Sequence, residues 1–192
     1  MDTPISVFKR MQTEKDCFLL ESIGQNHVTA RFSFIGRNPF ISFKSLNDEI
    51  TISDYTGKTN TYKGKPMEEL EKLIEKYKAP KLENIPSFNG GAVGFFAYDI
   101  IRQYEHLPNI NQDDLHLPDM HFMLMDEIIA FDHMRQKIVI IVNIHAEGDI
   151  ENQYKKATGR LLDIQQEMTD LSGLMIKEKR EYRSSSKMVS NM

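Results

Sequence analysis

Hydrophobic and polar residues alternate along much of the first 65 residues of this chain, a pattern typical of strands with one buried and one polar face. The run 17–23 (CFLLESI) is joined to the run 28–36 (VTARFSFIG) by residues 24–27 (GQNH), which have the composition of a turn. These two runs therefore predict a β-hairpin. Three further strands are predicted as an antiparallel meander, over residues 39–46, 49–55 and 59–64.

Other segments have the apolar spacing of amphipathic helices. Residues 66–79 (PMEELEKLIEKYKA) start with a proline and acidic residues, which favour a helix N-terminus, and Pro80 follows the last turn. Residues 151–173 predict a second helix, and residues 1–16 carry a weaker helical stripe. The stripe residues, in chain order, are Ile5, Phe8 and Met11; Met67, Leu70, Leu73, Ile74 and Tyr77; Tyr154, Ala157, Leu161, Leu162 and Ile164.

The segment 120–145 predicts two strands that meet at a turn near Asp132 and His133. The second strand, residues 137–144 (KIVIIVNI), is nearly all apolar, which predicts a central strand buried on both faces. Strands that follow one another in sequence, with helices between and after them, predict an α+β fold: a predominantly antiparallel β-sheet packed with helices.

Composition narrows the function classes. The 192 residues are 40% hydrophobic and 27% charged, which is typical of a globular protein, and the net charge of −4 argues against a nucleic-acid partner. The one cysteine, Cys17, excludes a disulfide framework and fits a reducing compartment. No apolar run has the length of a membrane helix and no signal peptide is recognised, so we expect a cytoplasmic protein without a membrane partner.

Motifs for catalysis or metal binding are weak. No nucleophile motif is present, and the scattered histidines lack metal-ligand spacing, so we assign neither catalytic nor metal-binding residues. The glycines of residues 89–94 (NGGAVG) are interpreted as turn and close-packing positions rather than a phosphate loop. The adjacent acids Asp126 and Glu127 are interpreted as solvated.

One cluster in the predicted hairpin suggests a binding site. Ser22 and Arg31 can approach each other across the hairpin, close to Glu21, Ser33 and the apolar Phe32. A carboxylate, a hydroxyl and a guanidinium beside apolar surface suit a zwitterionic amino acid, because the acid can hold the ammonium and the arginine the carboxylate. Ordinary cross-strand polar pairing explains the same residues and stays open as an alternative.

Several motifs, in the same order and approximate spacing, resemble the start of anthranilate synthase component I. They are TPISVFKRM, FLLESI, ARFSFIGRNPF, FNGGAVGFFAYDIIRQYEHLP, LPDMHFMLMDEIIAFDH and KIVIIVNI. The resemblance covers about residues 3–192. It implies a chorismate-using enzyme of tryptophan biosynthesis that makes anthranilate and pyruvate from chorismate and ammonia. It also implies Mg²⁺ as the cofactor of the full-length enzyme and a glutamine amidotransferase subunit as the source of ammonia.

The resemblance further implies an allosteric site for the end product L-tryptophan. In the family this site is formed by the LLES segment, the following strand and a Pro-x-Met segment from the second half of the enzyme, which this chain lacks. Carried onto this sequence, the implied tryptophan-binding residues are Leu20, Glu21, Ser22, Thr29, Ala30, Arg31, Phe32 and Ser33.

The resemblance also implies a division of the polypeptide. Residues 1–176 match the N-terminal regulatory domain, and residues 177–192 match a linker toward a C-terminal chorismate-binding catalytic domain. We therefore expect a fragment that is inactive by itself and binds neither chorismate nor Mg²⁺, so that no cofactor belongs to the fragment.

Two alternatives share part of this evidence. Aminodeoxychorismate synthase component I of folate biosynthesis has the same architecture, but LLES with Glu21 and the block that begins GGAVGFFAYD favour the anthranilate branch. A free-standing amino-acid-sensing module without catalysis is the second alternative.

Overall fold

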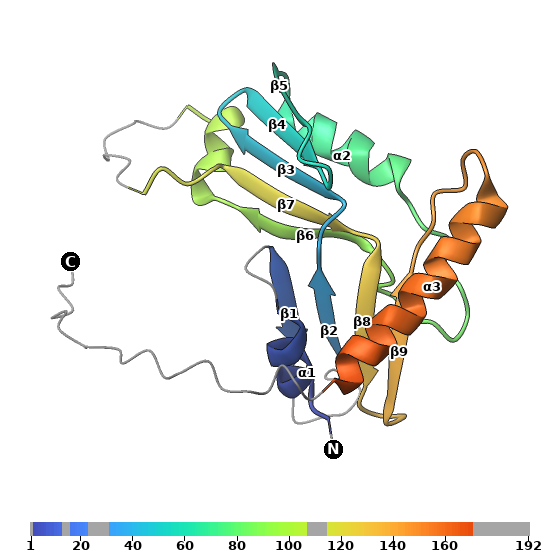
Figure 1. Ribbon diagram of the computed structural model, residues 1–192. Helices are drawn as coiled ribbons and strands as arrows, with labels where there is room; N and C mark the ends of the chain where they lie inside the picture. Colours follow the sequence, from blue (N-terminus) through green and yellow to red (C-terminus); the bar gives the residue numbers. More distant parts are fainter. Residues whose placement is uncertain (1, 13–15, 23–30, 107–114, 171–192) are drawn as a thin grey trace, which may run out of the picture.

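A computed structural model describes residues 2–12, 16–22, 31–106 and 115–170, which form two antiparallel β-sheets with helices packed against them (Figure 1). The first sheet has the strand order β1-β2-β8-β9, and the second has the order β5-β4-β3-β7-β6. Every strand pair is antiparallel. The predicted α+β fold is confirmed, whereas the predicted boundary at residue 176 and the linker 177–192 lie outside the described residues.

Runs of consecutive strands are separated by helices along the chain, which Figure 1 colours from blue to orange. Their bounds are α1 Pro4–Met11, β1 Cys17–Glu21, β2 Phe32–Arg37, β3 Ile41–Leu46, β4 Glu49–Asp54, β5 Thr59–Lys63, α2 Pro66–Lys76, β6 Gly91–Phe96, the 3-10 helix η1 Tyr98–Gln103, β7 Met120–Met125, β8 Glu127–Asp132, β9 Lys137–Val142 and α3 Ile150–Thr169. None of the helices in these described ranges combines the length and apolar character needed to cross a membrane.

Helix ends follow from local chemistry. The Thr3 side chain accepts from the Ser6 backbone N–H while the Ser6 hydroxyl accepts from the Thr3 N–H, so a capping box starts α1. Pro66 opens α2 as predicted, and the carboxylate of Asp149 accepts from the Asn152 N–H to cap α3. These caps satisfy backbone donors that have no partner within the helix.

Three clusters of buried apolar side chains form the core. One joins the first sheet to α1 and α3, one joins the second sheet to α2 and η1, and the third lies where the two sheets meet. Their buried members are, in that order, Val7, Met11, Ile35, Ile129, Phe131, Ile164 and Met168; Phe43, Ile50, Leu70, Met120 and Phe122; Phe18, Met125 and Ile128.

The predicted strand that starts at residue 120 is two strands in different sheets. The chain leaves β7 of the second sheet at Met125 and enters β8 of the first sheet at Glu127, so Asp126 marks the crossing. The apolar residues on either side of Asp126 and Glu127 do not reveal such a crossing, because β7 and β8 are both packed in the core.

The prediction that residues 137–144 form a central strand is wrong, because β9 is the edge strand of the first sheet. Ile140 and Val142 pack toward α1 and α3, while Ile141 packs on the opposite face against the third cluster. The apolar run therefore reports side-chain packing on both faces, not hydrogen bonding on both edges.

The predicted stripe of the last helix is partly wrong. Ile164 is buried, but Tyr154 and Leu162 are 67% and 62% exposed, and Met168 takes part in the core instead. In α1, Met11 is buried as predicted together with Val7, whereas Ile5 is 49% exposed. Short amphipathic segments leave the direction of the buried face to the tertiary contacts.

The glycine-rich segment has the structural role that was predicted. Gly90 and Gly91 have φ angles of 154° and 122°, which side-chain-bearing residues rarely adopt. A Cβ on Gly94 would lie 2.0 Å from the backbone oxygen of His121 in β7. The glycines therefore allow β6 to start after a tight turn and to approach β7 closely.

Candidate functional site

The register of the β1–β2 pair places the predicted tryptophan-binding residues on two opposite faces of the first sheet. Leu20 pairs with Phe34 on the face that carries Phe18 and the third core cluster. Glu21 pairs with Ser33, and the neighbouring pair on that face includes Ile35, which packs against α1 and α3. Residues that are adjacent in the LLES motif thus point to different sides of the sheet.

The predicted residues also differ in exposure. Leu20, Glu21 and Ser22 are exposed at the end of β1, whereas Phe32 is half-buried and Ser33 is buried. The remaining two predicted residues, Thr29 and Ala30, lie outside the described residues. The described structure therefore brings together a small exposed surface at the end of β1 and a partly buried one at the start of β2.

Arg31 is held by Asp132, 101 positions away in the sequence. Its Nε and Nη2 donate to the two carboxylate oxygens of Asp132 at 3.1 and 2.7 Å, and its guanidinium lies over the Phe32 ring, 4.7 Å from the ring centroid. The Asp132 carboxylate is nearly buried, and this charge-assisted pairing lowers its pKa to about 2. The guanidinium that was expected to hold a ligand carboxylate is thus already paired with a carboxylate of the protein.

Ser33 lies under the β8–β9 turn rather than on an open polar face. Its hydroxyl is 2.7 Å from Nε2 of His133, and the residue is 2% exposed. This contact explains how a serine is accommodated in a buried strand, because its polar group has a partner. His133, which sequence analysis left without a role, therefore closes the turn over β2.

A cavity of about 600 Å³ opens beside Arg31 and Phe32 on the face of the sheet opposite α1 and α3. The β8–β9 hairpin and the loop segment 84–87 form its other walls. Its lining residues from the strands and the turn are Arg31, Phe32, Asp132, Arg135, Lys137 and Val139.

Sequence analysis missed most of this cavity. Arg135 and Lys137 follow the predicted turn by a few residues, but they reach Arg31 only because β8 pairs with β2. The segment 84–87 joins the cavity from a loop in which Asn84 has a φ of 66°. No local pattern signals such a meeting, since the three segments are 45 or more positions apart in the sequence.

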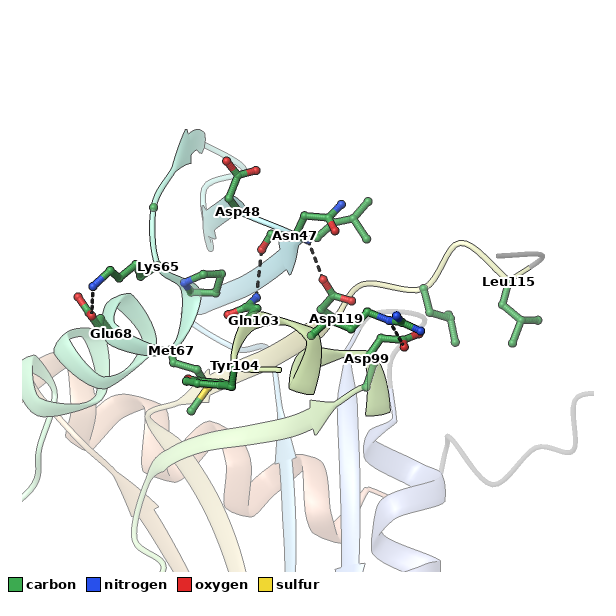
Figure 2. Close-up of a pocket in the computed structure, with 16 residues that line it drawn as sticks. Asn47, Asp48, Lys65, Met67, Glu68, Asp99, Gln103, Tyr104, Leu115 and Asp119 are labelled. Atoms are coloured by element: carbon green, nitrogen blue, oxygen red, sulfur yellow. Dashed lines mark hydrogen bonds and ion pairs between the residues drawn. The ribbon is translucent and has the colours of Figure 1, made fainter. Parts of the chain in front are cut away.

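The larger cavity, of about 920 Å³, lies at the far end of the second sheet and contains none of the predicted residues (Figure 2). The β3–β4 turn, the start of α2 and η1 surround it. Its walls are tied together: Gln103 donates to the Asn47 carbonyl, and the Asn47 N–H donates to Asp119. Two of its cations, Lys65 and Arg102, are paired with the nearby Glu68 and Asp99.

On the opposite side of the first sheet, charged residues form a network that joins α3 to the strands. Arg160 donates to both carboxylate oxygens of Glu127 at 2.6 and 2.9 Å and to Glu167 at 3.2 Å. Glu167 also pairs with Arg37 of β2. The interpretation of Glu127 as a solvated acid is wrong, because its side chain is 17% exposed and paired.

Burial changes the ionisation of this region. It raises the pKa of Asp126, and the neighbouring Glu127 charge raises it further. The same effect lowers the pKa of Arg37, which also lies near the positive charge of Arg160. The interpretation of Asp126 as solvated is therefore also wrong.

The described residues offer charged and apolar groups that can bind a ligand. They contain no group of three or more His, Cys, Asp or Glu residues that could hold a metal ion, so none of them is assigned to Mg²⁺. Arg31, Arg135 and Lys137 supply positive charge at the 600 Å³ cavity, and the surrounding side chains supply apolar contact.

Comparisons with known proteins agree with the predicted resemblance. The chain is 46% identical over 170 residues to anthranilate synthase component 1 of Acetivibrio thermocellus, a match that covers 88% of this chain and 34% of that protein. It is 37% identical over 161 residues to the protein of the same name from Saccharomyces cerevisiae, covering 81% of this chain and 29% of the relative. The chain thus spans about a third of the length of the curated relatives it matches.

A solved structure leads to the same family. The fold is similar to that of anthranilate synthase component I from Streptococcus pneumoniae TIGR4, with a TM-score of 0.55 and 29% identity over 88% of this chain and 37% of that one. The sequence profile described as chorismate binding enzyme matches residues 15–188. The chain therefore belongs to the chorismate binding enzyme family, and its resemblance to anthranilate synthase component I is confirmed.

Proposed function

We propose that this chain is the L-tryptophan-binding, regulatory part of an anthranilate synthase component I. The observation that carries the proposal is the end of β1, where Leu20, Glu21 and Ser22 of the LLES motif are exposed beside Arg31 and Phe32. Exposed apolar and polar groups side by side, next to a rigid guanidinium, suit a ligand with an aromatic body and a charged head.

The fixed position of Arg31 refines how the amino acid is held. Because Asp132 already neutralises the guanidinium, Arg31 contributes a stacked planar surface and its remaining N–H groups rather than a free charge. Glu21 supplies a carboxylate that can hold the ligand ammonium, although it points to the other side of the strand from Leu20. In the proposed intact enzyme, a Pro-x-Met segment from the second half completes the site.

The reaction of the intact enzyme belongs to the same proposal. It converts chorismate and ammonia into anthranilate and pyruvate, with Mg²⁺ as its cofactor and a glutamine amidotransferase subunit as the source of ammonia. Chorismate and Mg²⁺ bind a C-terminal catalytic domain of the same polypeptide. The present residues bind the end product and transmit its presence.

Replacing Ser22 in the intact enzyme tests the regulatory role. Ser22→Phe should fill the ligand site, so that tryptophan inhibition weakens by about tenfold or more while uninhibited turnover stays near its normal value. Thr61→Phe, an exposed position on β5 in the other sheet, is the control for adding an aromatic ring. Normal inhibition in the Ser22 variant would remove Ser22 from the site.

A second experiment tests whether the 192-residue chain by itself is active or binds tryptophan. The 192-residue chain with chorismate, ammonia and Mg²⁺ should form no anthranilate, and calorimetry should show weak or undetectable binding of L-tryptophan. Anthranilate fluorescence above that of a buffer blank would contradict the first expectation. Sub-micromolar tryptophan binding would mean that the site is complete within this chain.

A further inference from the structure

The cavity of about 600 Å³ between segment 84–87 and the β8–β9 hairpin has its own ligand chemistry. We infer that it binds a small organic anion with a flat apolar body and no ammonium group, such as an aromatic carboxylate. This cavity shares Arg31 and Phe32 with the proposed tryptophan site, but Leu20, Glu21 and Ser22 do not line it.

Charge is the first argument. Arg31 and Asp132 neutralise each other, whereas the side chains of Arg135 and Lys137 form no hydrogen bond or ion pair with any residue in the described ranges. Lys137 lies opposite Asp132 in the β8–β9 register without forming an ion pair with it. Arg135 also lies close enough to Asp132 for its charge to lower the pKa of that carboxyl, but three cations and one carboxylate leave the cavity with an excess of positive charge. In a chain whose net charge is −4, this local excess favours an anionic ligand.

Shape is the second argument. The Phe32 ring, Ile85, Pro86 and Val139 give the cavity apolar walls, and the Arg31 guanidinium is fixed over the Phe32 ring by its two bonds to Asp132. A planar cation held over apolar surface can stack against a planar ligand. The walls thus select a flat organic anion over a small inorganic one.

The described lining of the cavity has no free carboxylate that could pair with the ammonium group of an amino acid. Asp132 is the only carboxylate among the described lining residues, and its oxygens accept from Arg31 Nε, Arg31 Nη2 and the Arg135 backbone N–H. An ammonium ion that enters the cavity would meet positive charge without a free carboxylate partner, which makes its desolvation costly.

Three indole ligands test the carboxylate and the ammonium group separately. Indole-3-propionate carries only the carboxylate. L-Tryptophan has the same ring and carboxylate with an added ammonium group, and indole-3-propionamide has the same ring without the negative charge. Each is titrated into the ¹⁵N-labelled 192-residue chain, and amide shifts are followed at Ile85 and Val139 for the cavity and at Leu20 for the end of β1. Indole-3-propionate should bind at the cavity amides at least about tenfold more tightly than either of the others.

Matched charge variants provide the second test. Arg135→Gln combined with Lys137→Gln should weaken indole-3-propionate binding by about tenfold or more, because both exposed cations that face the ligand are lost. Lys9→Gln combined with Lys156→Gln removes the same charge from the exposed surfaces of α1 and α3 and should leave binding within about twofold. Unchanged circular dichroism and thermal midpoints identify folded variants.

Three results would overturn the inference. The first is that indole-3-propionate causes no amide shift at Ile85 and Val139, and the second is that L-tryptophan or the amide binds there equally well. The third is that both double variants lose the same affinity for indole-3-propionate. Shifts confined to Leu20 would assign the ligand to the end of β1 instead. The Ser22→Phe experiment does not depend on this cavity, so the two proposals fail separately.

Discussion

The charged residues on the two faces of the first sheet differ in their partners. On the face covered by α1 and α3, Arg37, Glu127, Arg160 and Glu167 are linked in one network above a continuous apolar core. On the opposite face, the Arg31–Asp132 pair is closed, but Arg135 and Lys137 are left over beside a cavity. Charges that satisfy one another stabilise the packing of elements, whereas charges without partners beside a cavity mark a place for a ligand.

Truncations on one strand include the largest expected loss of stability. Ile35 is 1% exposed in the core under the helices, so Ile35→Ala should lower the free energy of unfolding by about 3 kcal/mol. Phe32 is half-buried at the cavity, so Phe32→Ala should cost about 1.5 kcal/mol despite the larger side chain removed. Urea denaturation of both variants measures this, and an equal or larger loss for Phe32 would contradict the open cavity.

Arginine substitutions should cost less than the core truncation, but they should differ between the faces in the same direction. Arg160→Gln leaves the partly buried Glu127 without its two charge-assisted hydrogen bonds, at a cost of about 2 kcal/mol. Arg135→Gln should change stability by less than about 0.5 kcal/mol, because that exposed side chain has no hydrogen bond or ion pair within the described residues. A comparable loss for both would show that Arg135 is part of the folded framework.

Two aspartates should give pH effects of opposite sign. The folded-state pKa of Asp132 is lowered from 3.8 to about 2, so its stabilisation is complete above pH 3.8 and is lost as pH falls toward 2. Burial raises the pKa of Asp126, so stability is lost as pH rises through that value. When the free energy of unfolding is measured against pH, Asp132→Asn should reduce the loss of stability at low pH. Asp126→Asn should remove the loss of stability that accompanies rising pH.

The opposite result would be equally informative. If Asp132→Asn left the acid profile unchanged, the Arg31–Asp132 pair would not persist in solution. If Asp126→Asn lowered stability at neutral pH, the carboxylate would make favourable contacts that outweigh its burial. Either outcome would change the contrast between the two faces.

Local chemistry predicted much of the fold. Helix α2 starts at Pro66 with an acidic first turn, and the alternating patterns form strands β2 to β5, as predicted. The positive-φ glycines Gly90 and Gly91 likewise lie at the start of β6. These features depend on residues within one turn or two adjacent strands, so short sequence windows carry the information. The motifs along the chain likewise identified its family before any contact was known.

Tertiary structure decided the rest. The crossing at Asp126, the edge position of β9 and the buried face of α3 depend on which sheet and which helix lie alongside. The Arg31–Asp132 pair and the Arg160–Glu127 pair join residues 101 and 33 positions apart.

The candidate site shows the same division. The sequence by itself predicted the pairing of β1 with β2, in which Glu21 lies opposite Ser33, because a hairpin is a local structure. The tertiary structure decided that Asp132 occupies the guanidinium of Arg31 and that Arg135 and Lys137 remain available beside it. Pairing between β2 and β8 is a long-range contact that no short window specifies, and it alone determines which charges are neutralised.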